Sequence, residues 1–378
     1  MEPRRPRLSY YSYDSLQNPW CAGGGALRDF EVLRRYSKNW VITLSIGRYP
    51  GFVPQDNEGI RIRALGFGGM NWLSRLTFAI SANFRILFDN AAIVGNSLSP
   101  FAPILSGLLL RNRFFVVIHH EVGGESLKKF GVVGYVPLLL ESALFRGLRH
   151  FLVSNRAVAE RIRRMNPKSR VFVTSNSIDQ SLLSTDPKST DPPFILFLGR
   201  FDIHMKGLDI LIGAYQAMAS ASVVRLPRLI MAGAASPEAQ AAVRKLIPEN
   251  LAALIELRPN VSDLEKRDLF SSCLFFCGPS RFEGFGIAAL EANAAGKAVL
   301  VTDTDGYRDS VSPGKTALLI PPGNVQVLRT ALETLIQDAG LRETMGKAGR
   351  VWARGFNWDR IAEEEMKWIA SMVEAQPS

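Results

Sequence analysis

Short apolar runs alternate along the chain with longer segments in which apolar residues recur every three or four positions. The short runs predict buried strands, and the longer segments predict amphipathic helices. Strands are expected over 7–13, 39–47, 60–66, 91–97, 114–121, 150–155, 171–179, 194–200, 227–233, 250–262 with a turn, 274–278, 297–303 and 316–323. Helices are expected within 18–37 and over 69–90, 133–147, 155–165, 208–219, 236–248, 263–273, 287–296, 325–338 and 357–375. Strict alternation of strands and helices predicts an α/β protein with parallel sheets.

A polar stretch divides this pattern into two halves. Residues 181–193, SLLSTDPKSTDPP, are rich in Ser, Thr, Asp and Pro, which is typical of a linker. We therefore predict two Rossmann-like, doubly wound domains that face a central cleft, over residues 1–180 and 194–356. Residues 357–378 are expected to form a C-terminal helix.

Composition limits the class of protein. The chain has 378 residues, of which 47% are hydrophobic and 21% charged, and this excludes a disordered protein. Cys21, Cys273 and Cys277 have no spacing that suits a disulfide framework or a zinc site, so a reducing cytoplasm is expected. The basic start has no apolar segment after it and is not a signal peptide.

Two apolar segments raise the question of a membrane. Residues 91–110 carry no charge, but Asn96, two glycines and two prolines interrupt them, so a strand, a loop and the start of a helix are expected. The helix over 69–90 carries Trp72, Leu76 and Ile80 together with Arg75 and Arg85. It is either a core helix or an interfacial helix that touches lipid.

Positive charge is concentrated in the first half. The net charge is +10; residues 1–190 hold 25 Lys and Arg against 13 Asp and Glu, whereas residues 191–378 hold 20 against 22. An acidic partner or an anionic membrane surface is therefore expected at the N-terminal half. A nucleic-acid-binding protein is a weaker alternative, because no nucleic-acid module is recognisable.

The strongest chemical signal is PSRFEGFGIAALEANAAGK, residues 279–297. It predicts a glycine-rich turn between a strand and a helix, which directs backbone N–H groups at a phosphate. Glu283 lies in the turn and Glu291 in the helix, so both carboxylates can flank one ligand. Arg200 and Lys206 follow another strand, and together these groups suit a nucleotide-diphospho-sugar.

The N-terminal half has weaker candidates at its strand ends. Three glycines, among them Gly24 and Gly25, precede its first helix, but they lack the dinucleotide-binding spacing. His119 and His120 end a buried strand, where ligands of α/β sheets bind.

These motifs resemble the donor site of retaining GT-B glycosyltransferases of family 4, the glycosyl transferases group 1. The resemblance is carried by Gly-Arg200, Lys206-Gly and Glu283-Gly-Phe-Gly with Glu291, and it extends over residues 170–356. It implies a metal-independent hexosyltransferase without a cofactor, which moves a sugar from a UDP- or GDP-sugar to a glycan, lipid-linked or small-molecule acceptor. The final helix would cross back to the acceptor-binding N-terminal domain.

The resemblance also implies roles for single residues. Arg200 and Lys206 would hold the diphosphate, Glu291 the ribose and Glu283 the transferred sugar. His119, or else His120, would act across from Glu283. The remaining donor contacts would come from Gly24, Gly25, Val261, Phe285, Gly286 and Ile287.

Several other interpretations were weighed. A sugar-nucleotide epimerase or a phosphorylase could use the same fold. Asp303-Thr304-Asp305 resembles a manganese motif, but it ends a strand in the wrong context, so we expect an ordinary loop and no metal site. A cytoplasmic protein, peripheral on the inner face of the membrane, is the expected localisation.

Overall fold

A computed structural model describes residues 5–18, 20, 24–97, 104–110, 112–119, 132, 135–221 and 226–374. The chain divides into two compact units. Unit 1 consists of residues 1–176 and 358–378, and unit 2 consists of residues 177–357. Unit 2 is therefore inserted between two segments that fold together.

Unit 1 contains one sheet in the order β3-β4-β2-β1-β5-β6-β7-β8. Its strands are parallel except for β3, which pairs antiparallel with β4 at the edge. The strands are β1 (Arg7–Ser12), β2 (Val41–Gly47), β3 (Gln55–Asn57), β4 (Ile60–Leu65), β5 (Ile93–Ser97), β6 (Phe114–Ile118), β7 (His150–Val153) and β8 (Arg170–Val173). Both faces of the sheet are buried, which explains why β6 reads as an unbroken apolar run.

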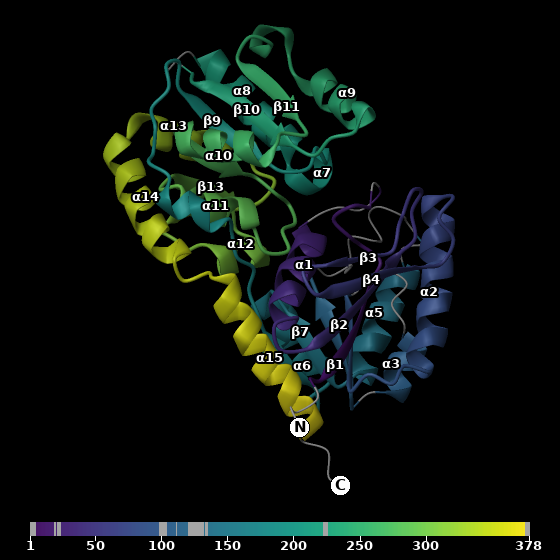
Figure 1. The fold of residues 1–378 in the computed structure, drawn as a ribbon. Coiled ribbons are helices and arrows are strands. Elements are labelled where there is room, and N and C mark those ends of the chain that lie inside the picture. The colour runs from purple at the N-terminus through teal and green to yellow at the C-terminus, as the bar shows by residue number, and fades with distance from the viewer. Residues whose placement is uncertain are drawn as a thin grey trace. The chain divides into compact units, whose positions relative to one another are not determined.

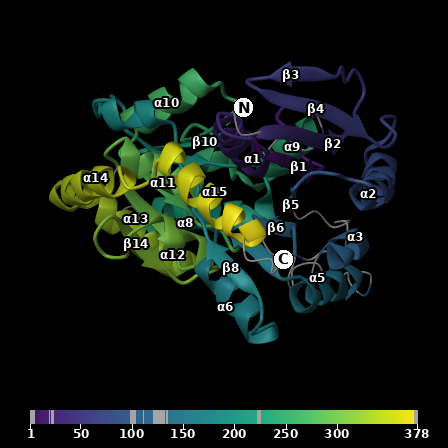
Figure 2. The ribbon, with the colours of Figure 1, turned by 60° about the horizontal axis from the view of Figure 1, so that its bottom comes forward.

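Helices cover both faces of this sheet. One core joins the sheet to α1 and α15, and a second core joins the opposite face to α2, α5 and α6. Figures 1 and 2 show α2, α3 and α5 grouped on one side of unit 1. The helices are α1 (Gly24–Tyr36), α2 (Asn71–Leu87), α3 (Ile104–Leu109), α5 (Tyr135–Gly147), α6 (Arg156–Met165) and α15 (Trp358–Glu374).

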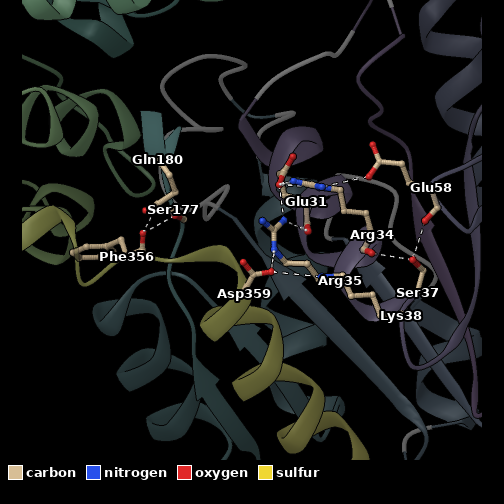
Figure 3. A network of polar contacts seen from close by, with 10 residues as sticks. All are labelled: Glu31, Arg34, Arg35, Ser37, Lys38, Glu58, Ser177, Gln180, Phe356 and Asp359. Carbon is tan, nitrogen blue, oxygen red and sulfur yellow. Dashed lines mark hydrogen bonds and ion pairs between the residues drawn. The ribbon is translucent and has the colours of Figure 1, made fainter. Parts of the chain in front are cut away.

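A buried polar network fixes α15 to unit 1. The Glu365 carboxylate accepts hydrogen bonds from Arg28 and Tyr36 of α1 and from Thr174. At the surface, Arg35 of α1 pairs with Asp359 of α15 at 2.9 Å (Figure 3). The last helix is thus part of the N-terminal fold by charge as well as by packing.

Unit 2 contains a wholly parallel sheet in the order β11-β10-β9-β12-β13-β14. Its strands are β9 (Phe194–Leu198), β10 (Arg228–Gly233), β11 (Ile255–Pro259), β12 (Phe275–Gly278), β13 (Ala298–Thr302) and β14 (Ala317–Ile320). The direction of winding reverses between β9 and β12. In open α/β sheets, ligands bind beyond the carboxyl ends of the strands at such a switch point.

Helices also cover both faces of the second sheet. One core contains α8, α9 and α13, and the other contains α10 and α11. The helical segments are η2 (Gln180–Ser184), α7 (Ile203–Lys206), α8 (Leu208–Ala221), α9 (Pro237–Leu246), η3 (Glu249–Leu251), α10 (Asp263–Ser272), α11 (Ile287–Ala294), α12 (Asp305–Ser310), α13 (Val325–Gln337) and α14 (Ala339–Ala353).

The segment predicted as a linker, 181–193, lies within unit 2. It contains most of η2, and Leu182 is buried in the core because it packs with the apolar residues around α11. Just before it, Ser177 and Gln180 both donate hydrogen bonds to the Phe356 carbonyl (Figure 3). The chain therefore enters unit 2 at residue 177 and leaves it after residue 357.

The predicted α/β fold with two parallel-sheet domains is confirmed. Residues 93–97 form β5 and 104–109 form α3, so the uncharged segment 91–110 contains a strand and a helix, as expected. Among the described residues, no helix is both long and apolar enough to cross a membrane. Sequence patterns missed β3 and α7, which are too short to show a period.

Candidate functional site

Two loops of unit 2 meet at the carboxyl edge of its sheet. One follows β9 and contains α7, and the other follows β12, the neighbouring strand. Gly207 ends α7 with a φ of +65°, and a Cβ there would overlap the carbonyl oxygen of Pro279. A glycine at this position lets the two loops approach each other closely.

This approach brings Lys206 and Glu283 together. The Lys206 Nζ lies 2.9 Å from the Glu283 Oε2, and both side chains are more than four-fifths buried. Ser280 also donates a weaker hydrogen bond to Glu283, at 3.4 Å. The ammonium is thus held at the switch point by a carboxylate from the adjacent loop.

The helix α11 begins beside this pair. Gly286 is its N-cap and has a φ of +90°, and Ile287 is its first residue. Phe285 is buried and fixes the loop to the core. Because the first N–H groups of a helix have no partner within it, this terminus favours an anionic group.

Glu291 lies one turn into α11 and is buried. Its Oε1 accepts a hydrogen bond from Lys266 of α10 at 2.8 Å. Burial raises the pKa of the Glu291 carboxyl, and the ammonium of Lys266 opposes this shift. Burial also acts to lower the pKa of Lys266, but Glu291 and Asp263 outweigh it and raise that pKa. The pair is therefore held in its charged form.

Two other predicted donor residues flank these pairs. Arg200 is exposed directly after β9. Val261 is half-buried next to Ser262, which caps α10 in a capping box with Glu265. The structure thus brings Lys206 and Glu283 into direct contact, and it places Arg200 and Val261 after strands of the same sheet edge.

The unit 1 candidates form a separate cluster. The ring of His119 lies directly over Gly25, where a Cβ would come within 3.0 Å of it. Gly24 starts α1, the helix that carries both glycines. The Nε2 of His119 lies 3.1 Å from Asp29 Oδ1, as an ion-pair contact and not as a well-aligned hydrogen bond. The alternative candidate, His120, lies outside the described residues.

Asp29 is the centre of this cluster. It accepts a hydrogen bond from the Tyr10 hydroxyl at 2.8 Å. Burial acts to raise its pKa, but His119, Arg28 and Tyr10 together outweigh burial and lower the pKa of Asp29. Burial next to this carboxylate raises the pKa of the Tyr10 hydroxyl. Asp29 is thus a buried carboxylate that is ionised at neutral pH.

A small cavity of about 60 Å³ opens beside Asp29. Its polar lining includes Ser12, Asp14, Ser15 and Gln17. Among the described residues, the hydroxyls of Ser12 and Ser15 and the Oδ2 of Asp29 are buried there without a hydrogen-bond partner. Such a lining suits a ligand that carries hydroxyl groups.

Sequence reasoning missed Lys266, Asp29 and Tyr10. The first two lie on helices and Tyr10 on a strand, without a motif, and only the fold brings them beside Glu291 and His119. Asp303 and Asp305 both pair with Arg308, as expected for an ordinary loop. The described residues contain no group of three His, Cys, Asp or Glu arranged for a metal ion.

Comparison with known proteins supports this site. Residues 182–352 match the family model described as "Glycosyl transferases group 1". A D-inositol 3-phosphate glycosyltransferase from Kribbella flavida is 32% identical over 46% of this chain and 42% of its own length. A phosphatidyl-myo-inositol mannosyltransferase from Mycobacterium leprae is 26% identical over 78% of each chain. The match to the first relative thus spans less than half of that protein.

A solved structure shows the same architecture throughout. The Anabaena protein HepE, in complex with UDP and glucose, aligns with a TM-score of 0.74 over 97% of this chain and 100% of its own, at 16% identity. Residues 182–352 therefore carry a glycosyl transferases group 1 domain, and the chain as a whole has the GT-B fold of glycosyltransferases.

Proposed function

We propose that the protein is a retaining, family 4 glycosyltransferase that takes its sugar from a UDP- or GDP-sugar. The observation that carries this proposal is the Lys206–Glu283 pair at the switch point of unit 2, next to the N-terminus of α11. It puts a cation, a carboxylate and helix amides at one place. A diphosphate and a sugar attached to it need these groups side by side.

The donor exchanges partners with this pair. Lys206 and Arg200 bind the diphosphate, while the N-terminus of α11, at Phe285, Gly286 and Ile287, receives its negative charge. Glu283 then accepts hydrogen bonds from hydroxyls of the sugar. As the glycosidic bond breaks, negative charge grows on the leaving diphosphate, and preorganised cations stabilise that charge most strongly where water is excluded.

Glu291 binds the ribose of the nucleotide. Lys266 keeps its carboxylate ionised despite burial, so that it accepts hydrogen bonds from a diol. Val261, next to α10, lies beside the nucleobase. The name of HepE's complex states that it holds UDP, which supports UDP as the first donor to test.

The acceptor side belongs to unit 1. His119 and Gly25 adjoin Asp29, and the cavity beside Asp29 offers unpartnered hydroxyls and a carboxylate to a hydroxylated acceptor. We infer a glycan, lipid-linked or small-molecule acceptor, with no metal or cofactor and no nucleic acid as partner. The protein acts in the cytoplasm, peripherally at the inner face of the membrane.

The test compares transfer by the protein and by variants of the pair. Lys206→Ala is expected to lower the rate of transfer from radiolabelled UDP- or GDP-sugars by about a hundredfold, because it removes the cation that stabilises the leaving group. Glu283→Ala should weaken transfer similarly. Lys347→Ala is the matched control, since Lys347 is 76% exposed and pairs only with Glu343 of its own helix.

Binding is measured first, by the thermal shift that UDP, GDP and ADP and their sugars produce. Full transfer by Lys206→Ala would contradict the site. Conversion of the donor without any acceptor would indicate an epimerase instead, and dependence on inorganic phosphate would indicate a phosphorylase.

A further inference from the structure

The helix α2 is apolar on both of its faces. Its inner face, formed by Ser74, Phe78, Ala82 and Ile86, is buried against the sheet. A second row lies two positions away from the first, on the opposite side of the helix, and its large side chains are between 42% and 70% exposed. This row consists of Trp72, Leu76, Ile80, Phe84 and Phe88.

A helix that is apolar all round is normally buried on all sides. Here the outer row has a regular spacing of four residues, and the rings of Phe84 and Phe88 lie 5.1 Å apart in solvent. Contiguous exposed apolar surface of this kind marks an interaction site and not the ordinary scatter of exposed hydrophobic residues.

Neighbouring helices extend this surface. Asn83 of α2 accepts a hydrogen bond from Ser106 of α3 at 3.1 Å, and α5 packs on the same face of the sheet as α2 (Figure 2). Their exposed side chains are also large and apolar. We call the outer row of α2, together with the following residues, the apolar face: Leu109, Tyr135, Val136 and Leu139.

Charge identifies the occupant. The only charged residues of α2 are Arg75 and Arg85, and the helix contains no acid. Unit 1 holds 26 Lys and Arg against 16 Asp and Glu, whereas unit 2 holds 19 of each, so unit 1 carries the whole net charge. Two copies of this face would bring like charges together, whereas an anionic bilayer attracts them.

We propose that the apolar face inserts into the interface of an anionic phospholipid membrane. Trp72, Ile80 and Phe84 enter the boundary between headgroups and acyl chains, and Arg85 binds lipid phosphates. The face is large enough in apolar side chains to act without a lipid anchor, because several exposed aromatic and aliphatic groups enter the bilayer together.

The position of the face also selects the acceptor. The helix α2 begins at the carboxyl edge of the sheet, where the Tyr13 hydroxyl donates a hydrogen bond to Asn71. His119 and the start of α1 lie at this same edge, since they too follow strand ends. A membrane at the apolar face therefore presents headgroups toward this edge. Resting on the proposed transferase activity, this assigns the acceptor as a hydroxyl-bearing headgroup of a membrane lipid.

The first experiment measures retention of the full chain on vesicles of phosphatidylcholine with phosphatidylglycerol. Retention at low salt is expected. The triple variant Trp72→Ser, Ile80→Ser, Phe84→Ser should lower the partition coefficient at least about tenfold, because three apolar groups no longer enter the bilayer. Arg85→Gln should lower it about fivefold.

The matched control is the double variant Leu264→Ser, Val351→Ser. These two residues are 71% and 68% exposed but belong to unit 2. The control should bind vesicles as the natural chain does. All variants replace exposed residues, so an unchanged melting temperature confirms that each one is folded.

Three results would overturn the proposal. The natural chain could fail to bind, the triple variant could bind equally well, or vesicles of phosphatidylcholine alone could retain the chain as strongly. Self-association of the natural chain that the triple variant abolishes, without vesicle binding, would instead assign the face to a second copy.

The acceptor is tested separately. With radiolabelled UDP-glucose and vesicles of a total lipid extract, label should enter the lipid phase with the natural chain and much less with the triple variant. Thermal shifts with UDP should be equal for both. Vesicle binding without lipid labelling would contradict the acceptor assignment, whereas loss of the UDP shift in both proteins would contradict the proposed function itself.

Discussion

Asp29 holds several partners at once although it is almost completely buried. Tyr10 donates to it, His119 contacts it, and Arg28 lies 3.9 Å away. A buried carboxylate with these neighbours fixes the ring of His119 over Gly25. Asp29 is therefore a positioning residue for the histidine, and it also presents its free Oδ2 to the cavity.

The lowered pKa of Asp29 makes a prediction about stability and pH. Its carboxylate stabilises the fold above its ordinary pKa of about 4, and this contribution is lost as the pH falls through the lowered pKa of the folded state. Asp29→Asn should therefore lower the free energy of unfolding at pH 7 by about 3 kcal/mol. The difference from the natural chain should shrink below about pH 4.

Urea unfolding followed by tryptophan fluorescence measures this effect. Five of the six tryptophans, all except Trp352, belong to unit 1. Asp56→Asn is the control, because Asp56 is exposed on β3 of the same unit. A difference that stays constant from pH 7 to about pH 3 would show that Asp29 is not ionised in the native state.

At the scale of elements, the donor side depends on the short helix α7 and the glycine that ends it. Asp202 caps α7 by accepting a hydrogen bond from the Met205 N–H at 2.9 Å. Gly207 then turns the chain in the left-handed conformation, directly over Pro279. This turn sets the distance between the loops that carry Lys206 and Glu283.

Gly207→Ala should therefore destabilise unit 2 by more than the conformational cost alone, about 2 kcal/mol or more. Gly323→Ala is the matched control, since Gly323 also has a positive φ, of +79°, but nothing lies within 4 Å of the added carbon. It should cost about 1 kcal/mol. Scanning calorimetry compares the two, and equal losses would show that the contact with Pro279 is unimportant.

The sequence predicted long elements well and short or non-local features poorly. Apolar periodicity identifies α2 and β6, because each repeats over enough residues to show its period. It could not show that Trp72 and Ile80 face solvent, because both faces of α2 read alike. The Glu291–Lys266 pair joins residues of two helices that no motif connects.

At the scale of the whole molecule, α15 completes unit 1 through Glu365. This carboxylate is fully buried and accepts hydrogen bonds from Arg28, Tyr36 and Thr174. Although burial favours loss of the proton, Glu365 and Asp29 raise the pKa of Arg28. The guanidinium therefore depends on a residue that lies in the last helix.

Glu365→Ala should lower the free energy of unfolding of unit 1 by about 4 kcal/mol, because it leaves the Arg28 charge buried and unpaired. Glu364→Ala is the matched control on the same helix. Its side chain is 55% exposed and pairs weakly with Arg360 at 3.7 Å, so the loss should stay below about 1 kcal/mol. Tryptophan fluorescence in urea measures both, and equal losses would contradict a structural role for the network.

The insertion of unit 2 into unit 1 has a consequence for synthesis. A ribosome produces the eight-stranded sheet first, but Arg28 acquires its carboxylate only when residue 365 has emerged. At ordinary elongation rates, residues 177–357 take roughly 10 to 40 s to translate. During that interval unit 2 can fold to completion, while the earlier-made unit 1 waits with an unpaired charge and an uncovered sheet face for its final helix.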